Sequence, residues 1–195
     1  MLSNVYQFKI TLIGSDPLIW RRIAVPEDYS FWDLHVAIQD SMGWQDCHLH
    51  AFKESEKVDI GIPSEDDTID DFKKVLPGWK IKIAEYFKTA GEKMMYEYDF
   101  GDGWEHEVLF ETISTVDKKI KYPKRLDGAN ACPPEDCGGI YGYYEMLDIL
   151  KKARSKRYKE ITEWLGDTFK PDHFNCKEVE FDNPSNRLKM MLSSM

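Results

Sequence analysis

The segment from Tyr96 to Val108, YEYDFGDGWEHEV, constrains the fold of this chain more than any other. Aromatic and polar side chains alternate on both sides of a glycine-containing centre, which is the period-two pattern of two half-buried strands. The pair Asp102-Gly103 is typical of a two-residue hairpin turn, because such a turn needs positive φ angles that Asp tolerates and Gly adopts freely. The segment therefore predicts a β-hairpin that crowds Asp99, Asp102 and His106 at one end, against a wall of aromatic rings.

The first part of the chain predicts a hairpin, a helix and a further strand. Residues 5–13 and 20–25 alternate as strands and are separated by the turn-forming sequence GSDP. Apolar side chains recur at helical spacing over residues 31–42, with Ser30 as a suitable N-cap and Gly43 as a left-handed terminator. Residues 47–53 alternate again and place His48 and His50 on one face of a third strand. This order of strand, strand, helix and strand resembles the opening of a β-grasp fold.

The rest of the chain predicts loops and C-terminal helices. Residues 54–75 lack regular apolar spacing and include six Asp or Glu residues between Asp59 and Asp71, so we expect an exposed acidic loop there. The Pro- and Gly-rich segment 122–142 predicts an irregular loop, and the spacing after it predicts helices over 143–153, over 158–165 and from Pro184 onward, with Asn183 as the cap of the last. We expect a single α+β domain over residues 1–195, with an antiparallel sheet, a second hairpin and C-terminal helices.

The acidic balance of the chain limits its partners. Its 195 residues carry a net charge of −9, which repels a phosphate backbone unless basic residues gather on one face, so nucleic acid is disfavoured as a partner. No apolar run approaches the roughly 20 residues that cross a bilayer, and the N-terminus has no secretory signal pattern. We therefore expect a cytoplasmic protein without a membrane partner, whose four cysteines stay reduced.

Five segments, taken in order, resemble the plasmid pRi ORF-three-like family, whose members are also described as passenger proteins of insertion elements. They are DPLIWRRIAVP (16–26), LHVAIQDSMGW (34–44), HLHAF (48–52), the 96–108 segment and ACPPEDCGGIYGY (131–143). The likeness spans about residues 5–180, and its most specific motifs are YDFGD with W-x-H, and CPPED-x-GG. The residues that match the family's motifs are Trp20, Arg21, His50, Tyr98, Asp99, Gly101, Asp102, Trp104, His106, Cys132, Pro133, Pro134, Glu135, Asp136 and Gly138.

The resemblance implies a fold and a genetic setting rather than a reaction. It implies an α+β domain with an antiparallel sheet. It also implies an association with plasmids and transposable elements. The family brings no defined biochemical activity with it, so any chemistry must be argued from the side chains themselves.

Two motif regions carry candidate catalytic groups, which we expect to converge in space: Asp99, Asp102, His106, Glu135 and Asp136. Carboxylate oxygens and imidazole nitrogens bind Zn, Mn or Fe, and a metal-bound water can act as a nucleophile. The same residues also have structural roles open to them, since Asp and Gly suit the turn and Glu135 with Asp136 can cap backbone amides. The candidate metal ligands are His48, His50, Asp102 and His106, but the chain has no pair of histidines four apart on a helix with an acid between them.

A second group of residues suits binding rather than catalysis. Aromatic side chains can line a groove for a partner protein, and the candidates are Trp20, Arg21, His50, Tyr98 and Trp104. Arg21 and Arg22 must point to opposite faces of their strand, and charges exposed along a sheet are the favoured interpretation of both.

Taken together, these patterns favour a non-catalytic binding or regulatory accessory protein associated with mobile elements. We expect another protein as its partner and no cofactor. The alternative is a metal-dependent hydrolase of phosphodiester or peptide bonds, for which a divalent metal would be the cofactor.

Overall fold

The computed structural model describes residues 4–63, 74–152, 155–166 and 169–194. In chain order the elements are β1 (Asn4–Leu12), β2 (Trp20–Pro26), α1 (Phe31–Met42), β3 (His50–Lys53), β4 (Val58–Gly61), β5 (Lys74–Pro77), η2 (Gly78–Lys80), η3 (Ile83–Glu85), β6 (Lys93–Tyr98), β7 (Trp104–Thr115), β8 (Lys124–Ala129), α2 (Gly139–Leu150), α3 (Lys156–Leu165), η4 (Cys176–Glu178) and α4 (Pro184–Ser194).

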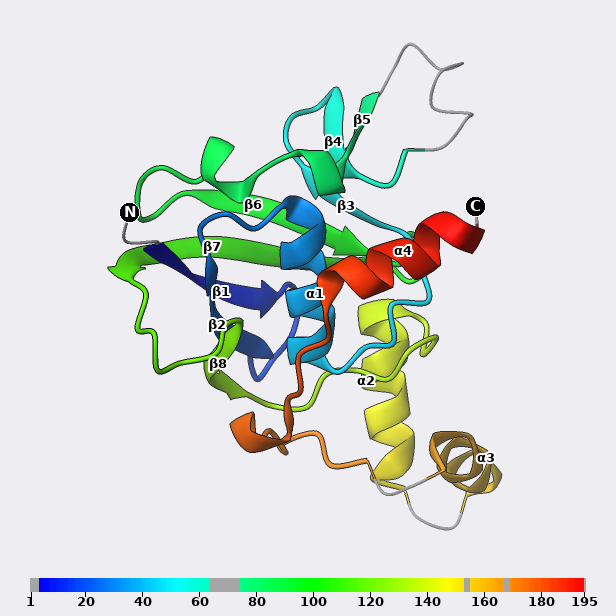
Figure 1. Ribbon diagram of the computed structural model, residues 1–195. Helices are drawn as coiled ribbons and strands as arrows, with labels where there is room; N and C mark the ends of the chain where they lie inside the picture. The colour runs from blue at the N-terminus through cyan, green and yellow to red at the C-terminus, as the bar shows by residue number, and fades with distance from the viewer. Residues whose placement is uncertain (1–3, 64–73, 153–154, 167–168, 195) are drawn as a thin grey trace.

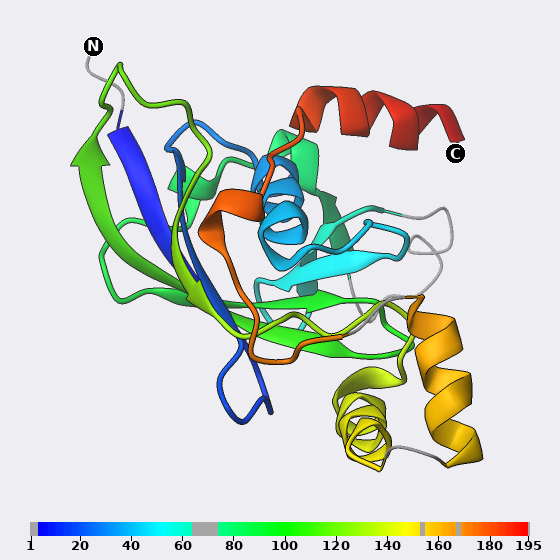
Figure 2. The ribbon, with the colours of Figure 1, turned by 90° about the horizontal axis from the view of Figure 1, so that it is seen from below.

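The strands form one twisted sheet in the order β5-β4-β3-β6-β7-β1-β2-β8. Every neighbouring pair is antiparallel except β4 with β5, which is parallel. Helix α1 lies across one face of the sheet, α4 crosses over α1, and α2 with α3 lie beyond one end of the strands (Figures 1 and 2). The predicted α+β class, the two hairpins and the C-terminal helices are confirmed.

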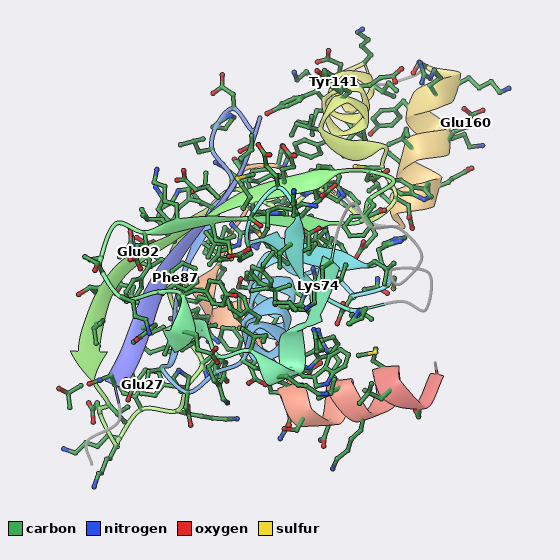
Figure 3. The ribbon with its side chains drawn as sticks, turned by 90° about the horizontal axis from the view of Figure 1, so that it is seen from above. Glu27, Lys74, Phe87, Glu92, Tyr141 and Glu160 are labelled. Atoms are coloured by element: carbon green, nitrogen blue, oxygen red, sulfur yellow. The ribbon has the colours of Figure 1, made fainter. Side chains whose placement is uncertain are left out.

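Alternation along the central strands separates a buried face from a wetter one. In β1 the side chains of Tyr6, Phe8, Ile10 and Leu12 face the core, while those between them are only partly covered. Phe87, labelled in Figure 3, closes the core under η3, where its ring packs edge-on against Phe8 with 4.9 Å between ring centroids. The period-two pattern of the sequence therefore reports the two sheet faces directly.

Helix α1 begins and ends as its sequence predicts. The Ser30 hydroxyl accepts a hydrogen bond from the backbone N–H of Asp33, and the Asp33 carboxylate accepts one from the N–H of Ser30, which is a capping box. At the other end Gly43 takes a left-handed φ of 94°, which costs a glycine little. The helix bounds are thus fixed by local chemistry at both ends.

The core face of α1 allows a direct stability test. Leu34 and Ile38 are each 0% exposed, so replacing either with Ala removes buried methyl groups and leaves a cavity. We expect Leu34→Ala and Ile38→Ala each to lower the free energy of unfolding by about 2–5 kcal/mol. Losses below about 1 kcal/mol for both variants in urea unfolding would contradict this placement of the helix.

The central hairpin has a longer turn than predicted. Tyr98 pairs directly with Trp104, so five residues, 99–103, connect β6 to β7 and form what we call the hairpin loop. The loop is closed by a hydrogen bond from the Gly103 N–H to the Asp99 carbonyl, with positive φ angles of 53° at Asp99 and 66° at Gly103. The two-residue Asp102-Gly103 turn is therefore wrong: a left-handed residue lies at each end of the loop, and Asp102 is free to make other bonds.

Three further sequence expectations need correction. The third strand is limited to His50–Lys53, since Asp46 has a φ of 60° and the chain before His50 is irregular. Within the expected acidic loop of residues 54–75, β4 and the start of β5 are strands, and Ile60 is 0% exposed, because β4 pairs with β3. Residues 64–73 lie outside the described residues. Helix α2 begins at Gly139, within the expected irregular loop, after Gly138 with a φ of 89°.

No helix among the described residues is long and apolar enough to cross a membrane.

Candidate functional site

Three segments meet where β6 ends and β7 begins. They are the hairpin loop; residues 43–49, which we call the histidine loop; and residues 132–136, the CPPED segment. The Trp44 ring nitrogen donates a 3.0 Å hydrogen bond to the carbonyl of Pro133, and the Asp99 N–H donates one of 2.9 Å to the carbonyl of Leu49. These bonds join the histidine loop to both of the other segments.

The imidazole of His48 faces carboxylates from both neighbouring segments. Its Nε2 lies 3.1 Å from Oδ1 of Asp136, 3.6 Å from Oδ2 of Asp99 and 3.9 Å from Oε2 of Glu135. Nε2 is shielded from solvent yet makes no well-formed hydrogen bond with any of the described residues. Ligand atoms of His48, Asp99 and Asp136 all lie within 4.8 Å of one another, so the three groups can reach one cation.

Glu135 is held in place by its own set of donors. Its carboxylate accepts hydrogen bonds from the Tyr98 hydroxyl at 3.1 Å and from the Gln45 N–H at 2.8 Å. Burial raises the pKa of Tyr98, and the charge of Glu135 raises it further. The phenol therefore keeps its proton and donates a hydrogen bond to Glu135. The Tyr98 hydroxyl also accepts a hydrogen bond from the Cys47 N–H, so Tyr98 is bonded to both the histidine loop and the CPPED segment.

Asp102 joins the hairpin loop to α2 instead of facing His48. Its Oδ2 accepts a 3.0 Å hydrogen bond from the N–H of Gly138, the N-cap residue of α2. The backbone approach is so close that a side-chain carbon on Gly139 would lie 2.3 Å from the Asp102 carbonyl oxygen. Asp102 therefore fixes the distance between Asp99 on one side and Asp136 on the other.

A hollow of about 510 Å³ opens beside the carboxylates. Its walls include Trp44, Pro133, Pro134, Asp136, Trp164 and Phe169, so α3 contributes one side. The side chain of Asp136 is 70% exposed, while that of Asp99 is 10% exposed. A ligand in the hollow would thus meet aromatic and proline side chains together with polar groups that include the carboxylates of Glu135 and Asp136.

His106 does not belong to this polar cluster. It is 0% exposed and lies between the rings of Trp44 and Tyr96, with centroid distances of 5.3 and 5.5 Å. Burial lowers the pKa of His106 to about 4, and the backbone groups of Tyr96 and Trp104 offset this only in part. Within the described part of the chain neither ring nitrogen makes a well-formed hydrogen bond, and the same holds for the buried ring nitrogen of Trp104. His106 is a neutral core residue.

His50 belongs to a second cluster beneath α1, different from the cluster that contains His48. The rings of His50 and His35 stack with centroids 3.4 Å apart and planes 8° apart, and Asp46 completes a group that includes two nitrogen ligands. Both nitrogens of His35 are engaged, one with the Tyr96 hydroxyl and one with Asp46, each at 2.8 Å. Since a metal must lie close to the plane of each imidazole that binds it, two stacked parallel rings cannot share one ion well.

Two of the sequence-predicted binding residues lie away from the site. Arg21 is 2% exposed, and its guanidinium donates to the carbonyls of Ser41, Trp20 and Ala129, so the expectation of a solvent-exposed charge is wrong for it. Its backbone carbonyl partners offset the cost of burying the charge. Trp20 stands on the opposite sheet face, where Lys9 and Arg22 lie over its ring at 5.1 and 5.0 Å.

Two of the cysteines near the site, Cys132 and Cys137, are unsuited to chemistry as thiolates. Burial raises the pKa of Cys137 to about 12 and raises that of Cys132 as well. Thiols with such raised pKa values stay protonated near neutral pH and are poor nucleophiles.

Sequence reasoning missed His35, Asp46 and Arg187. His35 follows Phe31 by four positions and precedes Ile38 by three, so its burial was readable from helical spacing. Asp46 and Arg187 carried no such signal, because they pair across most of the chain, with 3.4 Å between Nη1 and Oδ2.

The fold and this site together define an α+β protein with a His-carboxylate cluster at the end of an antiparallel sheet. The model of the plasmid pRiA4b ORF-3-like family matches residues 4–178. The chain is 35% identical over 170 residues to the uncharacterised protein y4hQ of Sinorhizobium fredii, which covers 85% of this chain and 83% of that protein. A crystal structure of a protein of unknown function from Methanosarcina mazei Go1 is similar with a TM-score of 0.81 at 38% identity, over 93% of this chain and 100% of that one. The chain belongs to the plasmid pRiA4b ORF-3-like family.

Proposed function

We propose that this protein is an accessory binding protein that holds a divalent transition metal between His48, Asp99 and Asp136, with Glu135 within reach. The observation that carries the proposal is the position of the His48 Nε2 atom, which faces carboxylates from two other segments. Two ligand atoms bound tetrahedrally at 2.0–2.1 Å from zinc lie about 3.4 Å apart. The 3.1 and 3.6 Å distances from Nε2 bracket this value.

The charge of the cluster also favours a cation. Among the residues that the structure describes, no Lys or Arg forms an ion pair with Asp99, Glu135 or Asp136. Carboxylate charges concentrated at a partly covered site create a negative potential that attracts a positive ion. Mixed imidazole and carboxylate ligands suit Zn, Mn or Fe more than Ca or Mg.

The accessory role completes the proposal and rests on sequence arguments. The family's plasmid-derived description supports an association with mobile elements. In this role the metal fixes the three segments around the hollow, where a partner protein binds.

Metal titration tests the proposal. Untagged protein, stripped with a chelator and dialysed, is titrated with Zn²⁺ and Mn²⁺ in a calorimeter. We expect one site per chain, with affinity reduced at least about 100-fold in His48→Ala and Asp99→Asn, because even groups that only orient metal ligands cost roughly 10–100-fold when changed.

The matched control is His173→Ala. His173 is an exposed histidine that pairs with Glu178 at 3.0 Å, so its loss removes an imidazole–carboxylate pair of similar length away from the site. Equal metal affinities for His48→Ala and His173→Ala, or no metal binding by the wild-type protein, would contradict the proposal. His48 would then only form a pair with Asp136.

A metal-dependent hydrolase is the second candidate, and the open hollow favours it. Catalytic zinc sites have three protein ligands and a free position for water, and Asp136 lies both in the cluster and in the wall of the hollow. Hydrolysis of phosphodiester or peptide substrates by the metal-loaded protein, lost in His48→Ala and kept in His173→Ala, would replace the accessory role with this one.

A further inference from the structure

Helix α4 is attached to α1 by a small set of polar contacts. The Trp32 ring nitrogen donates a 3.0 Å hydrogen bond to the carbonyl of Pro184, and the N–H of Asp182 donates one of 2.9 Å to Asp40. Figure 1 shows α4 crossing over α1 on the side away from the sheet. The helix lies outside residues 4–178, which the family model matches.

The central contact is the guanidinium of Arg187. Its Nη2 lies 2.8 Å from Oδ1 of Asp40 and also bonds to Asp182, while Nη1 lies 3.4 Å from Oδ2 of Asp46. The side chains of Arg187, Asp40 and Asp46 are 17%, 6% and 10% exposed. Ion pairs that are covered to this degree are screened less by solvent than exposed ones, so their geometry constrains the backbone more strongly.

Asp46 transmits this contact to the histidine loop. Its Oδ1 lies 2.8 Å from Nε2 of His35, while its Oδ2 faces Arg187. Its backbone holds a left-handed φ of 60°, a conformation that a non-glycine residue keeps only when its surroundings fix it. Asp46 thus lies clamped between α1 and α4, two residues before His48.

We propose that Arg187 is a positioning residue of the metal site: by clamping Asp46, it fixes the histidine loop so that His48 faces Asp99 and Asp136. The inference rests on the proposed metal function for its consequence and on the contacts of Asp46 for its mechanism. Helix α4 and the metal site are thereby coupled, so that release of α4 weakens metal binding and bound metal favours the docked helix.

The test compares Arg187→Met with Lys189→Met, which removes a cation from the exposed side of the same helix. We expect Arg187→Met to weaken Zn²⁺ binding about tenfold and to speed amide hydrogen exchange at residues 45–49, with Lys189→Met unchanged in both. Arg187→Lys should recover part of the affinity, since it restores the charge but not the forked geometry. The visible spectrum of bound Co²⁺ should change in Arg187→Met, which a mere loss of global stability would not produce.

Asp46→Asn provides the second variant, because it breaks the clamp while Asp40 and Asp182 still hold α4. It should reproduce the loop exchange and the affinity loss, and Arg187→Met added to it should cost little more, since both act through one contact. Wild-type exchange at residues 45–49 in both variants would overturn the inference. If the wild-type protein binds no metal, the proposed function fails by itself, and the exchange rates alone decide whether Arg187 positions the loop.

Discussion

Replacing Gly139 with Ala is expected to lower the free energy of unfolding by about 2–5 kcal/mol. Gly139 has a φ of 66°, where an L-residue costs roughly 1–2 kcal/mol. The added methyl group would lie 2.3 Å from the carbonyl oxygen of Asp102, and relieving such a clash with backbone costs about 1–3 kcal/mol more. Chemical denaturation of the wild type and of Gly139→Ala measures the loss in free energy of unfolding.

Gly103→Ala is the matched control for this prediction. Gly103 has the same φ of 66°, but apart from its chain neighbours no atom of the described residues lies within 4 Å of the position its side chain would take. It should therefore lose only the roughly 1–2 kcal/mol of backbone strain. Gly139→Ala should also weaken metal binding, because the displaced α2 carries Asp136 away from Asp99. Equal destabilisation of the two variants would contradict the close contact between α2 and the hairpin loop.

Acid is expected to destabilise the protein strongly through His106. The unfolded chain binds a proton there at the ordinary pKa of 6.5, whereas the buried imidazole binds one only near pH 4. Because the folded-state pKa is the lower of the two, the stabilising effect of neutral His106 is complete above pH 6.5 and is lost as the pH falls toward 4. At 1.36 kcal/mol per unit this amounts to about 3 kcal/mol.

The measurement is the free energy of unfolding of the wild type and of His106→Leu at several pH values between 7 and 4. Leu is uncharged and similar in size, so the variant should lose less stability over this range, with a difference of about 3 kcal/mol at the acid end. His173→Leu, which removes an exposed imidazole, should follow the wild type. Parallel curves for wild type and His106→Leu would show that His106 does not titrate as a buried group.

Most of the fold could be predicted from sequence patterns because many of its features are determined by residues that are close together in the chain. The capping box at Ser30, the helical spacing of α1 and the period-two strands all arise from neighbours in sequence, and the structure confirms them. Strand β4 was missed because its burial depends on pairing with β3 and, in parallel, with β5, which a polar-looking sequence does not reveal. The hairpin loop was predicted too short because Asp99 occupies a left-handed conformation that Asp-Gly alone did not indicate.

The acidic residues of the candidate site were predicted from the sequence, whereas the histidine expected beside them was His106. Asp99, Glu135 and Asp136 were expected to converge, and all three face one imidazole. That imidazole is His48 rather than His106, because strand alternation turns His106 into the core while the irregular histidine loop carries His48 outward. Pairing His48 with His50 was wrong for the same reason: the strand begins only at His50.

We propose that His48, Asp99 and Asp136 hold one metal ion. Crystals of the chelator-stripped protein, soaked with Zn²⁺ and measured at the zinc absorption edge, test it most directly. We expect an anomalous difference peak about 2.0–2.2 Å from His48 Nε2 and from an oxygen of each aspartate, and no such peak in Asp99→Asn. A peak at His35 and His50 instead, or an unoccupied His48 in crystals that bind zinc elsewhere, would contradict it.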